Sequence, residues 1–430
     1  MGDLLHLRTV RKRMPKPEPF PNATLADESV GQVGASRGGA KVVIVASAQP
    51  IYADVRIFQK EARTLAAHGY NVTLFSRAEG RVMPFVEEGV RVVPLDYLTR
   101  GQIVFGLPGL FRRLLREKAD VYHLHNPFSL PLALALKAAR RKVIYDVHED
   151  YIERIRIRQW LPRVLRVPVA YFVGAMERLV GKIADGAIAT QPEVASRLGG
   201  RAILLENAPM VNDAVVVRSE TFAAEIPDEL ANPEGAFRII YAGSISRVRG
   251  LPAMMDALRL VNEVTPARLW LIGSLDDETG LADAMHHPAW LQVDLVGRLE
   301  HQHEVFGYML RANVGLALFR DWGGYARISS NKLYEYMASG IPFVASAFPR
   351  WQERLKSVAA GFFCEPTDAE CVALNLVDLV RHPEKARQMS DKGRTFIRTE
   401  FNWDNDKVKL LALYRHVMAE DQQSAETATE

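Results

Sequence analysis

The segment RISSNKLYEYMASGIPFVAS, residues 327–346, brings small polar residues, a lysine and a glutamate to the start of one predicted helix. We expect this helix from about Lys332 to Ser339, because Gly340 and a following proline end it. A helix start offers free backbone amides and the positive end of a dipole, which suits a diphosphate. Glu335, one turn further on, can accept hydrogen bonds from ribose hydroxyls. The alternative is a capped helix with an exposed glutamate.

A second block, YAGSISRVRGL at residues 241–251, predicts a strand, a glycine-flanked loop and a helix. Gly243 and Gly250 allow the backbone to come close to a ligand. Arg247 and Arg249 bring positive charge to the same loop. The pattern favours an anionic ligand, with a pair of surface-loop arginines as the alternative.

Histidines lie at the ends of two further predicted strands, VYHLH and VIYDV. These are His123, His125 and His148, and the carboxyl ends of strands are where a doubly wound sheet builds its site. His148 is followed by Glu149 and Asp150, so neighbouring carboxylates can tune its charge and tautomer. For His123 and His125, packed or capping histidines remain the alternative to contact with substrate.

Two series of short apolar strands, separated by helical patterns, must position these residues. The first series, in residues 41–208, comprises KVVIVAS, YNVTLFS, VRVVPL, VYHLH, KVIYDV, GAIAT and AILLE. The second, in residues 237–402, comprises FRIIYAG, ARLWLIG, LQVDLVG, VGLALF and PFVAS. Continuous apolar strands indicate parallel sheets covered on both faces. We therefore predict an α/β protein of two doubly wound, Rossmann-like domains, with a proline-containing linker at 209–236.

The remaining segments complete the predicted organisation. Residues 1–40 and 420–430 are polar and without periodicity, so we expect disordered tails. The helix predicted at 403–419 has no partner left in the second sheet, so we expect it to cross back onto the first domain.

Composition excludes several classes of protein. The chain of 430 residues is too long for one typical core. Its 54 basic and 51 acidic residues nearly balance, which gives no reason to propose nucleic acid as a partner. No signal peptide, membrane span or zinc-like spacing of Cys and His is present. We expect a cytoplasmic protein without a metal site, in which Cys364 and Cys371 are free thiols.

Basic and apolar residues alternate between residues 151 and 182. Arginines interleaved with Ile, Leu, Val and Trp160 suit the surface of an anionic membrane. Peripheral contact at the inner face of a membrane is therefore one prediction. An ordinary covering segment with snorkelling arginines is the alternative.

The motif NKLYEYMASGIPFVAS resembles the signature of the family 4 glycosyltransferases, which have the two-domain GT-B fold with a cleft between the domains. The resemblance implies that Glu335 holds the ribose of a nucleotide-sugar donor. It also implies that amides at Ser329, Ser330 and Asn331 hold the donor diphosphate.

The same resemblance extends to the other motifs. Arg249 matches the basic residue before glycine that binds the diphosphate, whereas Ser244 stands where many members have an arginine, for which Arg247 can compensate. His148 resembles the histidine that contacts the donor sugar. Members commonly place two glutamates eight positions apart, but counting back from Glu335 lands on Arg327. An arginine there suits the diphosphate or a carboxylate on the donor sugar, and an exposed loop arginine is the alternative.

The segment ADVRIFQKEARTLAAHGYNV resembles a subset of these enzymes linked to polysaccharide assembly in the cell envelope. Its loop faces the cleft, so the resemblance implies that Asp54 and Arg56, with His125, lie on the acceptor side. A helix N-cap is the alternative for Asp54.

The resemblance implies a hexosyltransferase that moves a sugar from a nucleoside diphosphate-sugar, such as a UDP-sugar, to a hydroxyl of a glycan or lipid-linked glycan, with retention. Preorganised charge on Arg249 and Lys332, with His148 at the donor sugar, would stabilise the departing diphosphate without a metal or other cofactor. The absent first glutamate keeps open a non-catalytic nucleotide-sugar-binding scaffold subunit. An epimerase acting on a nucleotide sugar shares the architecture.

Overall fold

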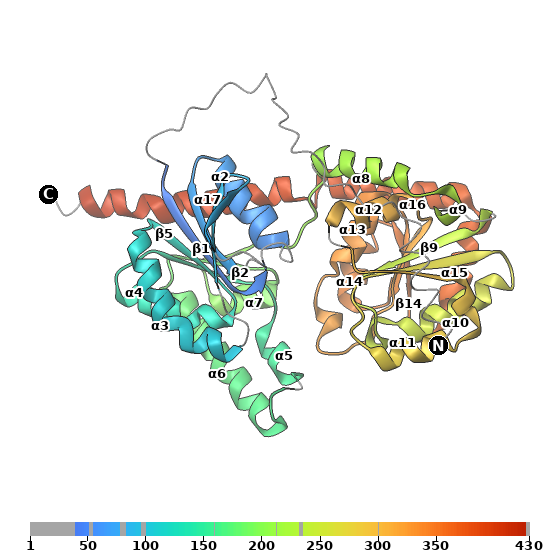
Figure 1. Ribbon diagram of the computed structural model, residues 1–430, viewed down its shortest axis with the longest axis horizontal. Coiled ribbons are helices and arrows are strands. Elements are labelled where there is room, and N and C mark those ends of the chain that lie inside the picture. The colour runs from blue at the N-terminus through green and yellow to red at the C-terminus, as the bar shows by residue number, and fades with distance from the viewer. Residues whose placement is uncertain are drawn as a thin grey trace, which may run out of the picture. The chain divides into compact units, whose positions relative to one another are not determined.

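The computed structural model describes residues 39–50, 55–77, 83–95, 100–158, 160–211, 213–231, 235–299 and 301–426. Within these ranges the chain forms two compact units (Figure 1). The N-terminal unit extends to Asn207 and resumes at Trp403, and the C-terminal unit runs from Ala208 to Asn402. The predicted division into domains placed these boundaries at residues 208 and 402.

The N-terminal unit is built on a sheet with the strand order β3-β4-β2-β1-β5-β6-β7-β8. The strands are β1 (Lys41–Pro50), β2 (Asn71–Arg77), β3 (Phe85–Glu87), β4 (Val90–Pro94), β5 (Val121–His125), β6 (Val143–Val147), β7 (Gly186–Ala189) and β8 (Ala202–Leu204). Neighbours pair in parallel, except that β3 is antiparallel to β4. Strand order reverses between β1 and β5, which is where such sheets bind ligands.

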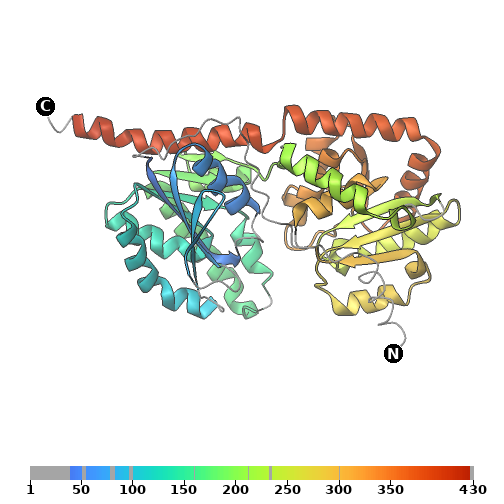
Figure 2. The ribbon, with the colours of Figure 1, turned by 45° about the horizontal axis from the view of Figure 1, so that its top comes forward.

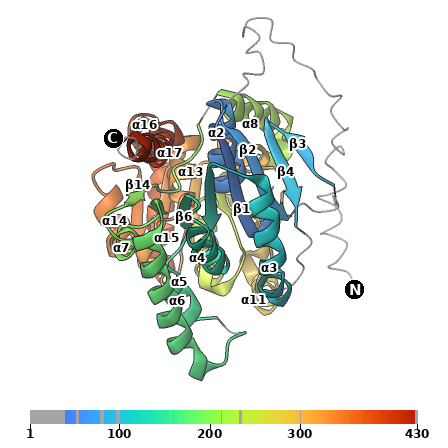
Figure 3. The same cartoon turned by 90° about the vertical axis from the view of Figure 1, so that its left-hand side faces the viewer.

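Helices cover both faces of this sheet (Figure 3). They are η1 (Val55–Ala62, π-helical), α2 (Arg63–Ala67), α3 (Arg100–Glu117), α4 (Leu130–Ala138), α5 (Tyr151–Arg156), α6 (Arg163–Ile183), α7 (Pro192–Leu198) and α17 (Trp403–Glu426). In β5, Tyr122 and Leu124 face the core under α3, α4 and α6. Because side chains alternate along a strand, His123 and His125 point to the opposite face, under η1 and α17.

The last helix belongs to the N-terminal unit, as predicted (Figure 2). The Nζ of Lys142 donates to the carbonyl oxygen of Val417 at 2.8 Å. A Cβ on Gly186 would lie 2.9 Å from the Cδ1 of Leu413, so α17 needs a glycine in β7 to pack this closely. The helix runs to Glu426, beyond the predicted 403–419, and includes part of the predicted tail.

The C-terminal unit has a second sheet, with the strand order β11-β10-β9-β12-β13-β14 and parallel pairing throughout. The strands are β9 (Phe237–Ala242), β10 (Ala267–Ile272), β11 (Val293–Gly297), β12 (Val314–Ala317), β13 (Phe343–Ser346) and β14 (Gly361–Cys364). The helices are α8 (Asp213–Glu225), α9 (Asp228–Ala231), η4 (Arg247–Arg249), α10 (Leu251–Asn262), α11 (Glu278–Met285), η5 (Pro288–Gln292), α12 (Gln302–Leu310), η6 (Tyr325–Arg327), α13 (Asn331–Ser339), α14 (Pro349–Leu355), α15 (Ala369–Arg381) and α16 (Pro383–Thr399).

The predicted linker at 209–236 is largely helical. It contains α8 and α9, and α8 packs against α12, where a Cβ on Gly307 would meet the Phe222 ring at 2.6 Å. Pro209 precedes α8 and Pro227 lies between the two helices. These prolines border helices rather than mark an unstructured stretch, because proline is tolerated at helix ends.

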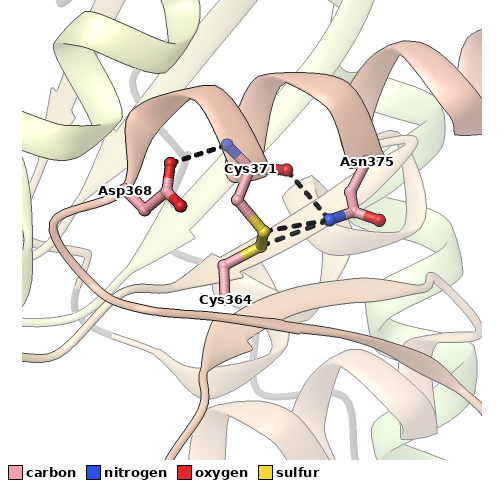
Figure 4. Close-up of a disulfide and its surroundings, with 4 residues drawn as sticks. All are labelled: Cys364, Asp368, Cys371 and Asn375. Atoms are coloured by element: carbon pink, nitrogen blue, oxygen red, sulfur yellow. Dashed lines mark hydrogen bonds between the residues drawn. A yellow bond between two sulfur atoms is a disulfide. The ribbon is translucent and has the colours of Figure 1, made fainter.

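Cys364 and Cys371 form a disulfide, so the prediction of two free thiols is wrong (Figure 4). Cys364 ends β14, and α15 places Cys371 in its first turn, which brings the two Cα atoms to 6.0 Å. The Asp368 carboxylate accepts from the Cys371 amide at 2.9 Å and caps the helix. The Asn375 side chain donates toward Cys364 Sγ at 3.2 Å. This strand-to-helix turn is a tertiary feature that spacing in the sequence does not reveal.

Candidate functional site

The motif residues of the C-terminal unit gather where its strand order reverses, at the carboxyl ends of β9 and β12. The chain leaves β9 through Gly243 into η4, and it leaves β12 toward η6 and α13. Gly243 has φ 150°, and a Cβ there would lie 2.4 Å from the Nζ of Lys332. Gly250 has φ 91°, and its Cβ would lie 2.0 Å from the carbonyl oxygen of Leu318. Both glycines are therefore required by close approach and by backbone conformation.

Arg249 lies against two adjacent aromatic rings. Its guanidinium carbon is 4.4 Å from the centroid of Phe319 and 4.3 Å from that of Tyr325. These cation–π contacts hold the side chain in place. Among the described residues, no carboxylate forms an ion pair with Arg249.

Lys332 reaches the same place from the first turn of α13. Its Nζ lies 5.8 Å from the centroid of Phe319 and 5.9 Å from that of Tyr241, and it too has no carboxylate in ion-pair distance within the described residues. Loss of water around the ammonium lowers the pKa of Lys332 to about 8. The charge of Glu335 opposes this shift in the pKa, and that of Arg249 adds to it. The two cations and Glu335 are thus within electrostatic range of one another.

The start of α13 is fixed by its own packing. The Tyr336 hydroxyl donates to the carbonyl oxygen of Leu316 at 3.0 Å, which ties the helix to β12. Ser330, the residue before the helix, is buried, Ser329 is half-buried and Asn331 is exposed. Glu335 is half-buried one turn later.

Two predicted donor-site residues are placed differently. Arg247 forms ion pairs with Asp277 at 3.0 Å and with Asp283 of α11, so its charge is already balanced. Arg327 ends η6 with an exposed side chain. The structure therefore brings Gly243, Arg249, Lys332 and Glu335 together and directs Arg247 elsewhere.

The N-terminal unit holds a buried cluster of ionisable groups at its own strand-order reversal. Arg56 and Glu61 come from η1, His123 and His125 from β5, and Asp146 from β6. The Arg56 guanidinium lies 3.0 Å from Asp146 Oδ2 and 2.9 Å from Glu61 Oε1. His123 Nε2 and His125 Nδ1 lie 3.8 and 3.7 Å from the same Asp146 oxygen.

Burial sets the protonation of this cluster. Loss of water lowers the pKa of His123 to about 4 and that of His125 well below its usual value, so both imidazoles are neutral. Burial works against ionisation of Asp146, but the charge of Arg56 keeps the pKa of this carboxyl below its usual value. His123 Nδ1 is hydrogen-bonded to the Tyr414 hydroxyl of α17 at 2.8 Å.

Within this cluster the histidines differ in access. His125 Nδ1 lies 2.9 Å from His148 Nε2, so the two imidazoles share a hydrogen bond. The side chain of His125 is fully buried, and that of His148 is 10% exposed. Arg56, predicted to face an acceptor, is 6% exposed and also donates to Leu205 O at 2.9 Å. His148 is therefore the member through which the cluster reaches the surface, and Asp54 lies outside the described residues.

Four members of the cluster have the residue types of a metal site. Glu61, His123, His125 and Asp146 each offer a ligand atom within 4.8 Å of the others, although their spacing in the sequence does not indicate it. The Arg56 guanidinium already contacts both carboxyl groups. We interpret the group as an ion network in which Arg56 supplies the positive charge.

Comparison with known proteins places the chain in a family. The model for Glycosyltransferase Family 4 matches residues 56–203, and the model for Glycosyl transferases group 1 matches residues 236–382. Together these matches cover more than half of the 430 residues. The chain belongs to the family 4 glycosyltransferases, and its activity is that of a glycosyltransferase.

Individual proteins resemble the chain in sequence or in fold. A phosphatidyl-myo-inositol mannosyltransferase of Mycobacterium leprae is 23% identical over 83% of this chain and 91% of its own length. Sucrose-phosphate synthase of Thermosynechococcus elongatus has a TM-score of 0.69 at 19% identity, covering 89% of this chain and 100% of that one. Anabaena HepE, solved in complex with UDP-glucose, has a TM-score of 0.62 at 14% identity, covering 89% and 99%. These structures confirm the predicted GT-B fold.

Proposed function

We propose that the C-terminal unit binds a nucleoside diphosphate-sugar and that the sugar is transferred, with retention, to a hydroxyl of a glycan or lipid-linked glycan. The observation that carries the proposal is the pair of cations, Arg249 and Lys332, held by aromatic rings without a carboxylate partner among the described residues. Both lie at the edge of a parallel sheet where anionic ligands bind, beside the start of α13.

Each group has a definite task in this proposal. Arg249, Lys332 and the amides at Ser329, Ser330 and Asn331 bind the diphosphate, and Glu335 accepts from the ribose hydroxyls. The cations are positioned before the reaction, so they stabilise the charge that develops as the diphosphate departs, without a metal. His148 contacts the donor sugar. The likeness to HepE, which was solved with UDP-glucose, favours a UDP-sugar as the donor.

Replacing Arg249 or Glu335 with alanine should weaken nucleoside diphosphate binding by roughly 1–3 kcal/mol each, the usual cost of losing a charged hydrogen-bond partner. Isothermal titration with UDP and GDP measures the effect. Arg247→Ala is the matched control, because this arginine of the same loop is engaged by Asp277 and should leave affinity nearly unchanged. Unchanged affinity in both site variants would refute the assignment.

The low pKa of Lys332 predicts a pH dependence of nucleotide binding. Only the ammonium form attracts a diphosphate, so affinity should fall as pH rises through about 8. Between pH 7 and pH 9 we expect a loss of up to about tenfold, since one pH unit above a pKa leaves roughly a tenth of the group charged. Calorimetry at both pH values gives the ratio. Lys332→Met should bind more weakly at pH 7 and show no such dependence; a ratio equal to that of the native protein would contradict the prediction.

Arg327 is proposed to contact either the donor diphosphate or a carboxylate on the donor sugar, such as that of a uronic acid. An exposed guanidinium matches the paired oxygens of both groups. A panel of donors tested with native protein and Arg327→Ala separates these roles. Selective loss of turnover with acidic sugars assigns the carboxylate, uniform loss assigns the diphosphate, and unchanged turnover excludes Arg327 from the site.

The two alternatives predict other products. A scaffold subunit would bind the nucleotide sugar and return it unchanged, and an epimerase would return an isomeric nucleotide sugar. Incubation with a labelled donor and candidate acceptors distinguishes them from transfer. A role in polysaccharide assembly would place the acceptor at the inner face of a membrane, with peripheral contact through residues 151–182. Within the described residues, no helix is long and apolar enough to cross a membrane.

A further inference from the structure

The helices α5 and α6 form a hairpin whose far end extends beyond the rest of the N-terminal unit (Figures 1 and 3). The base of the hairpin, where it joins the rest of the unit, is held by close packing and by a buried ion pair. A Cβ on Gly174 would lie 2.6 Å from Ile152 Cδ1, so the two helices pack closely. Farther along α6, the buried Glu177 pairs with Arg197 at 3.0 Å. The first turns of α6 are therefore carried outward on a fixed support.

The outward face of α6 is apolar. Val164 is 81% exposed, Tyr171 60% and Phe172 65%, and Leu165 and Leu179 are also exposed. Val164 and Tyr171 are seven positions apart, as are Leu165, Phe172 and Leu179, so these residues form two neighbouring rows on one side of the helix. Large apolar side chains gathered in this way mark a binding surface rather than ordinary scatter.

The chain segment that carries most of this face has charges of one sign. Residues 157–176 contain no aspartate or glutamate, and Arg158, Arg163 and Arg166 lie at the end of the hairpin. Arg158 and Arg163 are exposed and have no ion-pair partner among the described residues. Arg178 and Lys182, both exposed, extend the positive charge along α6. Apolar residues bordered by unpaired cations match the two layers of an anionic lipid surface, which are acyl chains beneath negative headgroups.

We propose that the exposed face of α6, with the arginines at the end of the α5–α6 hairpin, is a docking surface for an anionic lipid bilayer. The apolar rows enter the boundary between headgroups and acyl chains, and the arginines contact lipid phosphates. A second copy of this chain fits less well, because two such faces would bring like charges together. This docking surface rests on the proposed function, because it specifies the membrane surface at which the protein would meet a lipid-linked acceptor. Vesicle binding and nucleotide binding are measured separately, so either can fail alone.

The test is flotation of the full chain with vesicles of phosphatidylcholine, with and without phosphatidylglycerol. Binding is expected only with the anionic lipid and should weaken as salt is raised. Arg158→Gln with Arg163→Gln should lower the partition coefficient about thirtyfold. Each charge contributes about 1 kcal/mol, and about 1.4 kcal/mol corresponds to a factor of ten. Val164→Ser with Phe172→Ser should lower it at least tenfold.

Matched controls lie in the C-terminal unit. Lys392→Gln with Arg398→Gln removes the same charge from exposed positions of α16, and Leu374→Ser with Leu291→Ser removes equally exposed apolar side chains. These variants should bind vesicles as the native chain does, and circular dichroism checks that all variants fold. Absence of native binding to anionic vesicles, or equal losses in control and α6 variants, overturns the proposal. A native dimer that Val164→Ser with Phe172→Ser converts to a monomer, without vesicle binding, assigns the face to a second copy instead.

Discussion

Arg56→Met is expected to lower the free energy of unfolding of the N-terminal unit by about 3–5 kcal/mol, the cost of removing one partner of a buried ion pair. Asp146 and Glu61 would keep two carboxylates in an interior from which water is excluded. The variant would also lose the hydrogen bonds from Arg56 to Leu205 O at 2.9 Å and to Asn207 Oδ1 at 3.0 Å. These carbonyl and amide oxygens lie where the chain leaves the unit.

Urea unfolding followed by circular dichroism gives the free energy, and Arg63→Met is the control. Arg63 lies two turns later, is 35% exposed and pairs with Glu88 at 3.3 Å, so its replacement should cost less than about 1 kcal/mol. Adding Asp146→Asn to Arg56→Met removes one buried charge and should recover part of the loss. Equal effects of the two arginine substitutions would show that the cluster is not an ion network.

Acidification should destabilise the N-terminal unit through its buried histidines. The pKa of His123 is about 4 in the folded protein and near 6.5 in an unfolded chain. Between these values the unfolded state binds a proton that the folded state does not, so the stability present above pH 6.5 is lost as pH falls toward 4. The loss attributable to His123 is about 3 kcal/mol, at 1.36 kcal/mol per unit of pKa.

A comparison of native protein with His123→Asn isolates this contribution, because asparagine keeps a polar group near the position of Nδ1 but does not titrate. The stability difference between the two should shrink by about 3 kcal/mol from pH 7 to pH 4. Burial raises the pKa of Glu177 to about 7, which acts in the opposite sense, but it does so equally in both proteins and cancels. A difference independent of pH would mean that His123 is already charged when folded.

Continuous apolar runs were sufficient to predict most strands of both sheets, because parallel strands buried on both faces leave a signal in the sequence. Two strands were missed. Residues 85–87 form a short antiparallel edge strand, and GFFC at 361–364 begins with a glycine within a weakly periodic stretch. The disulfide that joins Cys364 to Cys371 depends on that second strand, so the error in the strand and the error in the thiols have one origin.

The sequence predicted only those residues of the candidate site that lie within single motifs. Arg249, Lys332 and Glu335 lie in motifs, whereas two of the aromatic rings that hold the cations do not. Phe319 and Tyr325 are separated from Arg249 by about seventy residues and meet it through the pairing of β9 with β12. The position of Arg247 depends on Asp277 and Asp283, which carry no motif at all. Residue types and spacing do not encode such partnerships.

The discontinuity of the N-terminal unit has a consequence for biosynthesis. Most of this unit is translated before the C-terminal unit, yet Trp403, whose indole donates to Thr64 at 2.9 Å, and Tyr414, which contacts His123, are made after it. The C-terminal unit, continuous from Ala208 to Asn402, can close its sheet while α17 is still being synthesised. We therefore expect the C-terminal unit to mature first, which reverses the usual order of domains on the ribosome. Until α17 arrives, the part of the first sheet that this helix covers, beside the histidine cluster, stays open to water.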